Sequence, residues 1–284
     1  MALDLTSVGR EFGPVERSWT SKDTLLYAVA CGAGTDELSF TTENTKGVAQ
    51  QTLPSWAVLM GMAPGGLEHV GPFDRTKLLH GEQSFSVTGP VPVEGRASVT
   101  GRIAGIYDKG SGALVVTEGV AVDAESGEER MRVKTGLFIR GEGGFGGDSG
   151  PASDGATISD AVAPNHSLSY ATSKDQALVY RLASGDRNPL HSDPAFAARG
   201  GFDRPILHGL CSYGFTCRAL VHLLCGGDAG RLRSMHARFL KPVLPGDELT
   251  VSVWSGAAGD AAFRTTTQRG ETVIDGGHVT FVAP

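Results

Sequence analysis

Residues 180–211 read YRLASGDRNPLHSDPAFAARGGFDRPILHGLC, and this stretch is the most informative part of the sequence. Within it, Asp186, Asn188 and His191 lie on a short segment bounded by prolines, where the chain cannot continue as a regular helix. Gly209 then opens a long apolar run. A carboxylate and an imidazole beside a glycine at a helix start are the groups that proton transfer next to a carbonyl requires.

Composition narrows the class of protein. The 284 residues carry a formal charge of -6, so we expect no nucleic-acid partner, because domains that bind nucleic acid are usually basic. No stretch of about 18 residues is free of charges and helix breakers, so we expect no membrane span. The amino terminus lacks a secretion signal, the carboxyl terminus lacks a peroxisomal address, and the four cysteines form no CxxC pair. These features predict a cytoplasmic protein with buried free thiols.

Two blocks of sequence occur twice, in the same order. The first block reads TSKDTLLYAVACGAG from Thr20 and TSKDQALVYRLASGD from Thr172. The second reads GPFDRTKLLHGEQ from Gly71 and GGFDRPILHGLC from Gly200. Because a chance match of both blocks is improbable, we interpret the chain as two copies of one structural unit.

The two copies differ where the chemistry would lie. The second copy has Asp186, Asn188 and His191 after its first block. The aligned residues of the first copy are Ala33, Thr35 and Leu38. None of these three can transfer a proton at neutral pH, so any catalysis belongs to the second copy.

A glycine-rich stretch, residues 140–167, separates the copies. Its GEGGFGG sequence has neither the following Lys-Ser/Thr of a phosphate loop nor a GxGxxG in a βαβ setting. We therefore expect a linker rather than a nucleotide site.

The pattern of apolar residues predicts an α+β protein. Residues 209–224 form the strongest helix candidate, and they are apolar nearly all the way round, which predicts a helix wrapped by sheet. Asp193 followed by a proline predicts a second, short helix start. Strands rich in Val, Ile and Thr are expected at residues 99–107, 113–123, 130–140, 234–240, 248–254, 261–269 and 272–282.

The quoted segment closely resembles the hydratase 2 motif of the MaoC-like dehydratases, a family that includes (R)-specific enoyl-CoA hydratases. The resemblance extends to LLHGEQ, YDKGSGALV and RGEGGFGG in the first half, so it covers nearly the whole chain. It implies a double hot dog fold, with a long central helix in the C-terminal unit. The implied domains are a non-catalytic, substrate-binding hot dog at 1–147, a linker at 148–164, and a catalytic hot dog at 165–284.

The resemblance also implies a reaction and a site. The family reversibly adds water to trans-2-enoyl-CoA to give (3R)-3-hydroxyacyl-CoA. Asp186 and His191 resemble the pair that activates water, Asn188 the residue that orients them, and Gly209 the backbone donor to the thioester oxygen. Further positions resemble those that contact the CoA thioester: His80, Gly81, Lys109 and Phe239. Neither a metal nor a cofactor is implied, since the CoA thioester is itself the substrate.

The same residues have ordinary structural explanations. Asp186 and Asn188 could form only an Asx turn, and His191 could be a structural histidine. His208 is expected to serve only as a helix cap, Lys109 could be solvated surface, and Phe239 could be strand core.

Two other functions remain open beside the hydratase, namely a hot dog acyl-CoA thioesterase and a non-catalytic acyl-thioester binding module. We expect medium to long acyl chains, because loss of a central helix from the first half would leave room for them. A homodimer is expected from the exposed edges of paired hot dogs. The identity of the carrier, CoA or acyl carrier protein, and which of Asp186 and His191 protonates C2 are left open.

Overall fold

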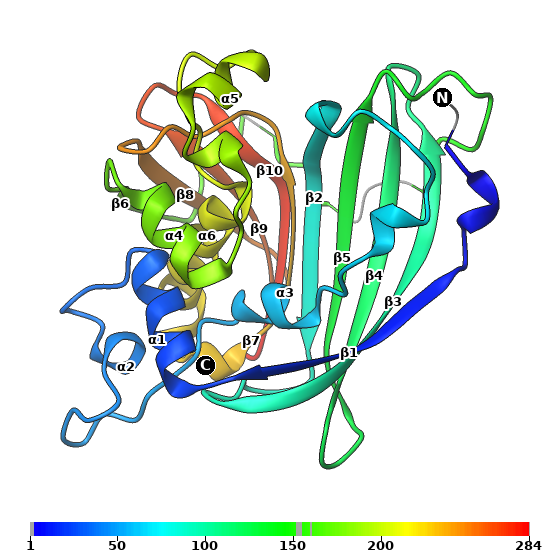
Figure 1. Cartoon of the computed structure of the whole chain (residues 1–284). Helices are drawn as coiled ribbons and strands as arrows, with labels where there is room; N and C mark the ends of the chain where they lie inside the picture. The colour runs from blue at the N-terminus through cyan, green and yellow to red at the C-terminus, as the bar shows by residue number, and fades with distance from the viewer. Residues whose placement is uncertain (1–2, 152–154, 160, 284) are drawn as a thin grey trace. The chain divides into compact units, whose positions relative to one another are not determined.

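The computed structural model describes residues 3–151, 155–159 and 161–283 of the chain. The polypeptide divides into two compact units (Figure 1). Unit 1 comprises residues 1–18, 57–88 and 96–154, and unit 2 comprises residues 19–56, 89–95 and 155–284. The first half of the chain therefore contributes to both units. Part of the predicted linker at 148–164 lies outside the described residues.

Unit 1 is built on a five-stranded antiparallel sheet in the order β1-β3-β4-β5-β2. Its core joins apolar residues of these strands to the segment near the amino terminus, including Phe12, Ile103 and Ile139. Among the described residues of this unit, helical structure is limited to α3 and short turns of 3-10 helix. The elements are η1 (Leu5–Ser7), β1 (Glu11–Trp19), α3 (Trp56–Gly61), η2 (Gly66–Glu68), η3 (Arg75–Lys77), β2 (Leu78–Val87), β3 (Gly95–Asp108), β4 (Gly112–Asp123) and β5 (Glu129–Arg140).

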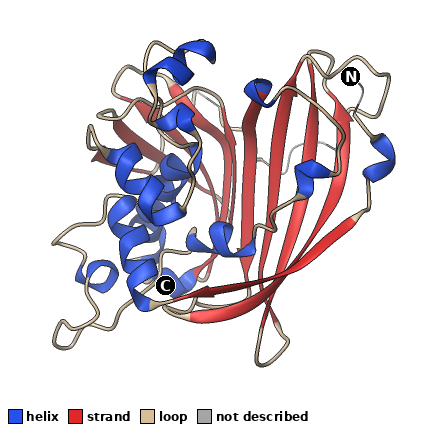
Figure 2. Ribbon diagram, viewed as in Figure 1, coloured by secondary structure: helices blue, strands red, loops and turns tan. Residues whose placement is uncertain are grey.

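Unit 2 holds a second five-stranded antiparallel sheet, in the order β7-β10-β9-β8-β6, together with most of the helical residues (Figure 2). Its strands are β6 (His166–Ala171), β7 (Leu232–Phe239), β8 (Glu248–Ser255), β9 (Asp260–Thr267) and β10 (Thr272–Phe281). Its helices are α1 (Ser21–Ala30), α2 (Leu38–Thr41), α4 (Gln176–Ser184), η4 (Pro189–His191), α5 (Pro194–Arg199), α6 (Gly209–Cys225) and η5 (Ala229–Arg231). The predicted α+β class and all seven predicted strands are confirmed.

The two sheets have the same strand order, as a duplication requires. Counting along each half, the outer strand β1 corresponds to β6, and β3, β4, β5 and β2 correspond to β8, β9, β10 and β7. The first repeated block also gives equivalent helices, α1 and α4, which pack together through Tyr27 and Tyr180 at 6.1 Å between ring centroids. Both tyrosines are buried.

The second repeated block does not occupy equivalent places, so this part of the repeat prediction is wrong. In the first half the block follows the short helix α3 and ends inside strand β2, which contains His80 and Gly81. In the second half the block ends inside the first turn of the long helix α6, which begins at Gly209. The same short sequence is thus strand in one copy and helix start in the other, because the residues that follow carry a period of two in β2 and an apolar helical run in α6.

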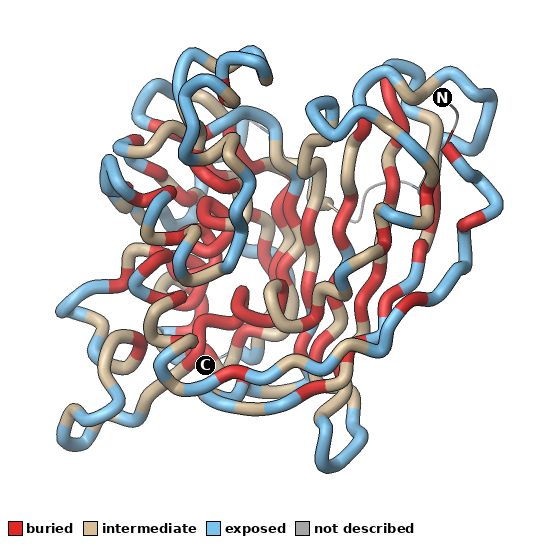
Figure 3. Tube along the Cα trace, viewed as in Figure 1, coloured by how far each residue is buried: buried red, intermediate tan, exposed pale blue. Residues whose placement is uncertain are grey.

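Helix α6 is the core of unit 2. Thirteen of its seventeen residues are buried, and it lies against β6, β7, β8 and β10 (Figure 3 shows the burial). Its polar side chains bond to the sheet: the Tyr213 hydroxyl donates to the Met235 carbonyl at 2.7 Å, and the Thr216 and Thr265 hydroxyls are 2.9 Å apart. The prediction of a helix wrapped by sheet is confirmed for this unit. All four cysteines are free and buried, as expected.

Glycine inside α6 has a packing reason. A Cβ placed on Gly214 would lie 2.3 Å from the Cys31 sulfur, so α1 can approach α6 only because this position lacks a side chain. The end of α1 exposes carbonyl groups that have no partner within the helix. Side chains of the neighbouring helices satisfy them: Gln176 Nε2 donates to the Ala30 carbonyl at 2.8 Å, and Arg218 donates to the Cys31 carbonyl at 3.2 Å.

The loop after α1 is tied to the last turns of α6 by a buried ion pair. Arg218 donates two hydrogen bonds from Nε to the Glu37 carboxylate at 2.8 and 2.9 Å, and His222 Nε2 lies 2.6 Å from the same group. The guanidinium also stacks over the Tyr170 ring, 3.7 Å from its centroid. Burial raises the pKa of Glu37, but the hydrogen bonds from His222 and Arg218 outweigh it and lower that pKa to about 2.

The glycine-rich segment after β5, which contains Gly144 and Gly146, has a defined conformation that hydrogen bonds stabilise. Backbone amides of Gly144 and Gly146 donate to the two oxygens of Asp108 at 2.8 Å, and the amide of Gly110 donates to the same carboxylate at 2.8 Å. The expected linker character therefore does not hold for these residues. Glycine amides close together in the chain can form a nest that binds an anion. Here the anion bound by the amides is the Asp108 carboxylate of the same chain. Among the described residues, no helix has the length and hydrophobicity of a membrane span.

We expect Gly214→Ala to destabilise the protein by about 1–3 kcal/mol, because the new methyl group overpacks the contact with Cys31. Urea unfolding measures the change. In a Cys31→Ala background the same substitution should cost clearly less, since the clashing sulfur is gone. Equal costs in the two backgrounds would contradict this explanation of the glycine.

We expect Glu37→Gln to lower the free energy of unfolding at neutral pH by about 3 kcal/mol, because it leaves a buried guanidinium without its counter-charge. The contribution of an acid with a lowered pKa is present above its ordinary value and is lost as the pH falls through the folded value. The difference in the free energy of unfolding between wild type and variant should therefore shrink as the pH falls from 4.5 to about 2. Asp36→Asn, an exposed neighbour, is the control and should change little at either pH.

Candidate active site

The loop after α4 places three of the predicted site residues. Helix α4 ends at Ser184, and the left-handed conformation of the next residue, Gly185 (φ 74°), turns the chain immediately before Asp186. The Asn188 amide donates to Asp186 Oδ1 at 2.9 Å, and Asn188 Oδ1 accepts from the Leu190 amide at 3.0 Å. The Asx-turn explanation of these residues therefore holds. It leaves Asp186 Oδ2 outside the turn, so the turn and a chemical role are compatible.

His191 ends the short 3-10 helix η4 that Asn188 caps. Its Nδ1 lies 2.9 Å from the Ile206 carbonyl oxygen. A carbonyl can only accept, so Nδ1 carries the hydrogen, and in the neutral ring Nε2 keeps its lone pair. This nitrogen can accept a proton.

His208 is a site residue whose sequence-based assignment was wrong. It occupies the position before α6, but its side chain makes no capping hydrogen bond. The ring is only 2% exposed and stacks on His191, with centroids 3.7 Å apart and an interplanar angle of 26°. Its Nε2 is 4.0 Å from Asp186 Oδ2. The sequence placed it next to Gly209 but gave no sign that its side chain turns back towards the acid.

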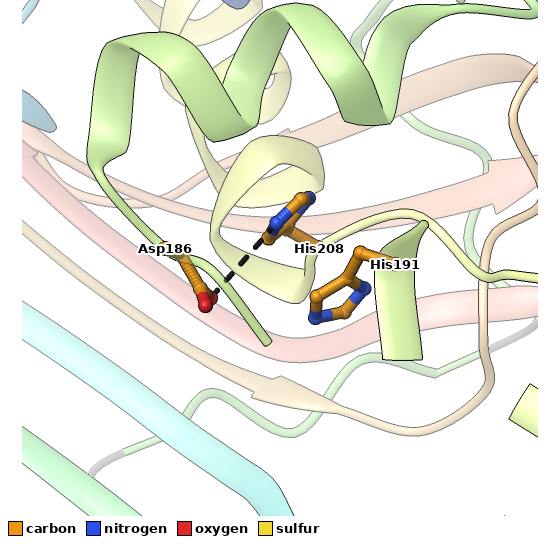
Figure 4. Close-up of side chains that lie close together, drawn as sticks. All are labelled: Asp186, His191 and His208. Atoms are coloured by element: carbon orange, nitrogen blue, oxygen red, sulfur yellow. Dashed lines mark ion pairs between the residues drawn. The ribbon is translucent and has the colours of Figure 1, made fainter. Parts of the chain in front are cut away.

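Asp186, His191 and His208 form one cluster (Figure 4). One carboxylate oxygen and one ring nitrogen from each histidine all lie within 4.8 Å of one another. A water molecule that bonds to two groups at about 2.8 Å holds them roughly 4.5 Å apart. The spacing of Asp186 and His191 therefore matches two groups that share a single water.

Electrostatics keep the two imidazoles neutral. Burial lowers the pKa of His191, against the opposing effects of the Ile206 carbonyl and the Asp186 carboxylate. Burial and then the neighbouring His191 lower the pKa of His208 to about 4. The side chain of Asp186 is 45% exposed and supplies the carboxylate of the cluster.

The cluster contains the ligand types of a metal centre, but its geometry does not favour one ion. The planes of the His191 and His208 rings differ by 26°, and the ring centroids are 3.7 Å apart. Planes in this arrangement meet only at a point far from the ring nitrogens. That point is roughly 8 Å from the ring centres, whereas a Zn–N bond is about 2.1 Å. A single ion could not lie in both ring planes without rotation of a histidine.

Gly209, the predicted thioester oxygen donor, is the first residue of α6. Its amide belongs to the first turn, where helix amides have no carbonyl partner within the helix and the helix end is partly positive. The Phe239 ring lies beside it, because a Cβ on Gly209 would be 3.4 Å from that ring. Phe239 ends strand β7 and also contacts Tyr213 at 6.3 Å between ring centroids.

The other three predicted substrate-binding residues belong to unit 1. His80 Nε2 lies 3.0 Å from Gln83 Oε1, and Gly81 sits at an irregularity in the β2–β5 register. Lys109 lies in the turn between β3 and β4, and its ammonium group donates to the Ser149 carbonyl. Their roles remain predictions.

Comparison with known proteins adds family information. The model described as "MaoC like domain" matches residues 160–276, and that described as "MFE-2 hydratase 2 N-terminal domain" matches residues 18–141. The chain is 46% identical, over its full length and that of the relative, to 3-hydroxyacyl-thioester dehydratase Y of Mycobacterium tuberculosis. It is 36% identical to a probable enoyl-CoA hydratase 2 of Dictyostelium discoideum, covering 100% of this chain and 98% of the relative.

Solved structures agree. A MaoC-like dehydratase from Phytophthora capsici superposes with a TM-score of 0.88 at 30% identity, covering 99% of this chain and 98% of its own. A Mycobacterium tuberculosis protein described as having a double hot dog fold gives a TM-score of 0.59 at 12% identity, covering 97% and 96% of the two chains. The predicted double hot dog fold is confirmed.

Proposed function

This chain belongs to the MaoC-like dehydratase family, and on that premise we propose that it reversibly hydrates trans-2-enoyl-CoA to (3R)-3-hydroxyacyl-CoA. It is a hydro-lyase. The observation that carries the mechanism is the spacing of Asp186 and His191, which lie within 4.8 Å of each other in a cluster that can hold one water.

The chemistry follows from the positions of these groups. Attack of water on C3 requires that the water lose a proton, and the free Nε2 of neutral His191 is the acceptor for it. Asp186 Oδ2 holds and orients the same water. The other proton transfer, to C2, is made within the same pair. Asn188 contributes by capping the 3-10 helix on which His191 lies.

Negative charge that develops on the thioester oxygen is stabilised by the amide of Gly209 at the start of α6. The absence of a side chain at this position allows the thioester to approach the backbone. Phe239 then packs against the bound acyl thioester. In unit 1, His80 and Gly81 contact the thioester, and Lys109 provides a cation for the CoA phosphates.

A difference between the copies supports the proposed length of the acyl chain. Helix α3 has six residues where unit 2 has the seventeen-residue α6 at the corresponding place in the chain. A shorter helix covers less of its sheet, and this supports substrates of medium to long chain length. The catalytic region is the C-terminal hot dog at 165–284, and the N-terminal hot dog at 1–147 binds substrate.

Further properties complete the proposal. The enzyme needs no cofactor, since water and the thioester are the reactants. It functions in the cytoplasm as a homodimer, without nucleic-acid or membrane partners. CoA is the proposed acyl carrier because relatives are named enoyl-CoA hydratase.

We expect Asp186→Asn and His191→Gln each to reduce the hydration rate by about 10²–10⁴-fold with substrate binding retained, because each removes one partner of the shared water. Loss of the conjugated-thioester absorbance measures the rate, and calorimetry with a saturated acyl-CoA measures binding. Asp193→Asn is the control, because Asp193 caps α5. Full hydration in either site variant would refute the assignment. Thiol release from the saturated acyl-CoA would instead indicate a thioesterase, and binding without turnover a binding module.

We expect turnover to extend to enoyl-CoAs of ten carbons and beyond, because the short helix α3 leaves the sheet of unit 1 less covered. The measurement is kcat/KM over a graded series of trans-2-enoyl-CoAs, with chiral analysis of the product. Activity confined to the four-carbon substrate would contradict the chain-length proposal, and an (S) product would contradict the proposed stereochemistry.

A further inference from the structure

His208 is a buried polar group without a well-formed hydrogen bond among the described residues. Both its ring nitrogens are inaccessible, and no contact of either nitrogen has full hydrogen-bond geometry, although the Asp186 backbone lies close enough to raise the pKa of the ring. Leaving such a group unsatisfied opposes folding, so a native protein that keeps one usually has a functional reason.

The contacts of His208 indicate that reason. One face of the ring covers the His191 imidazole at 3.7 Å, and the Tyr180 ring lies 5.1 Å away. His191 is therefore held in two ways, by the Ile206 carbonyl at its Nδ1 edge and by His208 against its face. Together these contacts fix the plane of the His191 ring and hence the direction of its Nε2 lone pair.

We propose that His208 is a positioning residue, whose aromatic ring holds the His191 imidazole in the plane in which Nε2 and Asp186 Oδ2 meet one water. The inference rests on the proposed hydratase function. His208 does not exchange protons with the substrate; it acts through His191.

The charges around His208 are consistent with this role. The ionisable groups that face it are Tyr180 and Arg181 from α4, Asp186 from the following loop, and His191 from η4. His191 becomes a cation when it takes a proton from water, and a neutral ring stacked on it does not oppose that charge. The ring of His208 remains neutral over the working range because its pKa is held near about 4.

Two substitutions separate the ring from its nitrogens. His208→Phe keeps a flat aromatic ring and removes both nitrogens, whereas His208→Gln keeps hydrogen-bonding groups and removes the ring. We expect the Phe variant to retain kcat within about fivefold. The Gln variant should lose about 10–100-fold in kcat with KM nearly unchanged, as expected for a misplaced catalytic group. His222→Gln removes an imidazole from the other end of the same helix and is the matched control, expected to keep the wild-type kcat.

Nitrogen NMR of the histidine side chains provides a readout that does not depend on turnover. In the wild type and in His208→Phe, we expect His191 in the single tautomer protonated at Nδ1. In His208→Gln it should populate both tautomers. Equal losses of kcat in the Phe and Gln variants, or an unchanged His191 tautomer in the Gln variant, would overturn the proposal. If the wild type hydrates no enoyl-CoA, the proposed function fails, but the tautomer comparison still tests the positioning.

Discussion

Helix α6 is contacted by the equivalent loops of both copies, the loop after α1 and the loop after α4, and the rest of unit 2 packs around it. The loop after α4 meets the residue just before this helix, because Asp186 approaches His208 to 4.0 Å. The loop after α1 meets its last turns through Glu37, Arg218 and His222. Equivalent loops thus contact opposite ends of one helix, because the first half provides only the short helix α3 of its own. The close approach of Cys31 to Gly214 joins α1 to the middle of the same helix.

The two loops have diverged into different tasks. In the second copy the loop carries a carboxylate and an imidazole that face each other near solvent, with Asp186 45% exposed. In the first copy the aligned positions are Ala33, Thr35 and Leu38. The neighbouring Glu37 forms an ion pair with the buried guanidinium of Arg218. The side chains of Glu37 and Arg218 are only 10% and 7% exposed. A carboxylate held in this way is unsuited to proton transfer, and its role is to anchor α6. One copy therefore stabilises helix α6, and the other copy places the proposed catalytic groups at the amino terminus of that helix.

The sequence predicted the features that depend on periodicity or on a long motif. Helix α6, the strands rich in β-branched residues, and the cap formed by Asp193 all follow from local pattern. It missed β1, β2 and β6, because polar and apolar residues are mixed along them and only the end of β2 alternates clearly. The second repeated block gave a wrong prediction because FDR and LHG are too short to determine a structure. The residues that follow Gly81 and Gly209 decide whether the chain becomes a strand or a helix. The GEGGFGG segment looked unstructured because its partner, Asp108, lies some distance back in the chain.

The cluster of Asp186, His191 and His208 shows even more clearly which contacts a sequence cannot predict. Asp186, Asn188 and His191 were predicted from one segment, and the turn that Asn188 and Asp186 form brings them together locally. His208 could not be assigned in this way, because its contact with His191 arises only when the segment after α5 returns to the start of α6. The position before a helix is usually a capping position, but here the helix cap is given up and the ring turns inward. A buried imidazole without a well-formed hydrogen bond lowers the stability of the fold. Local rules of sequence interpretation fail most often at sites where function requires such a cost. What the fold gains is a fixed His191 ring, held on one edge by a carbonyl and on one face by a neutral aromatic group that tolerates a positive charge beside it.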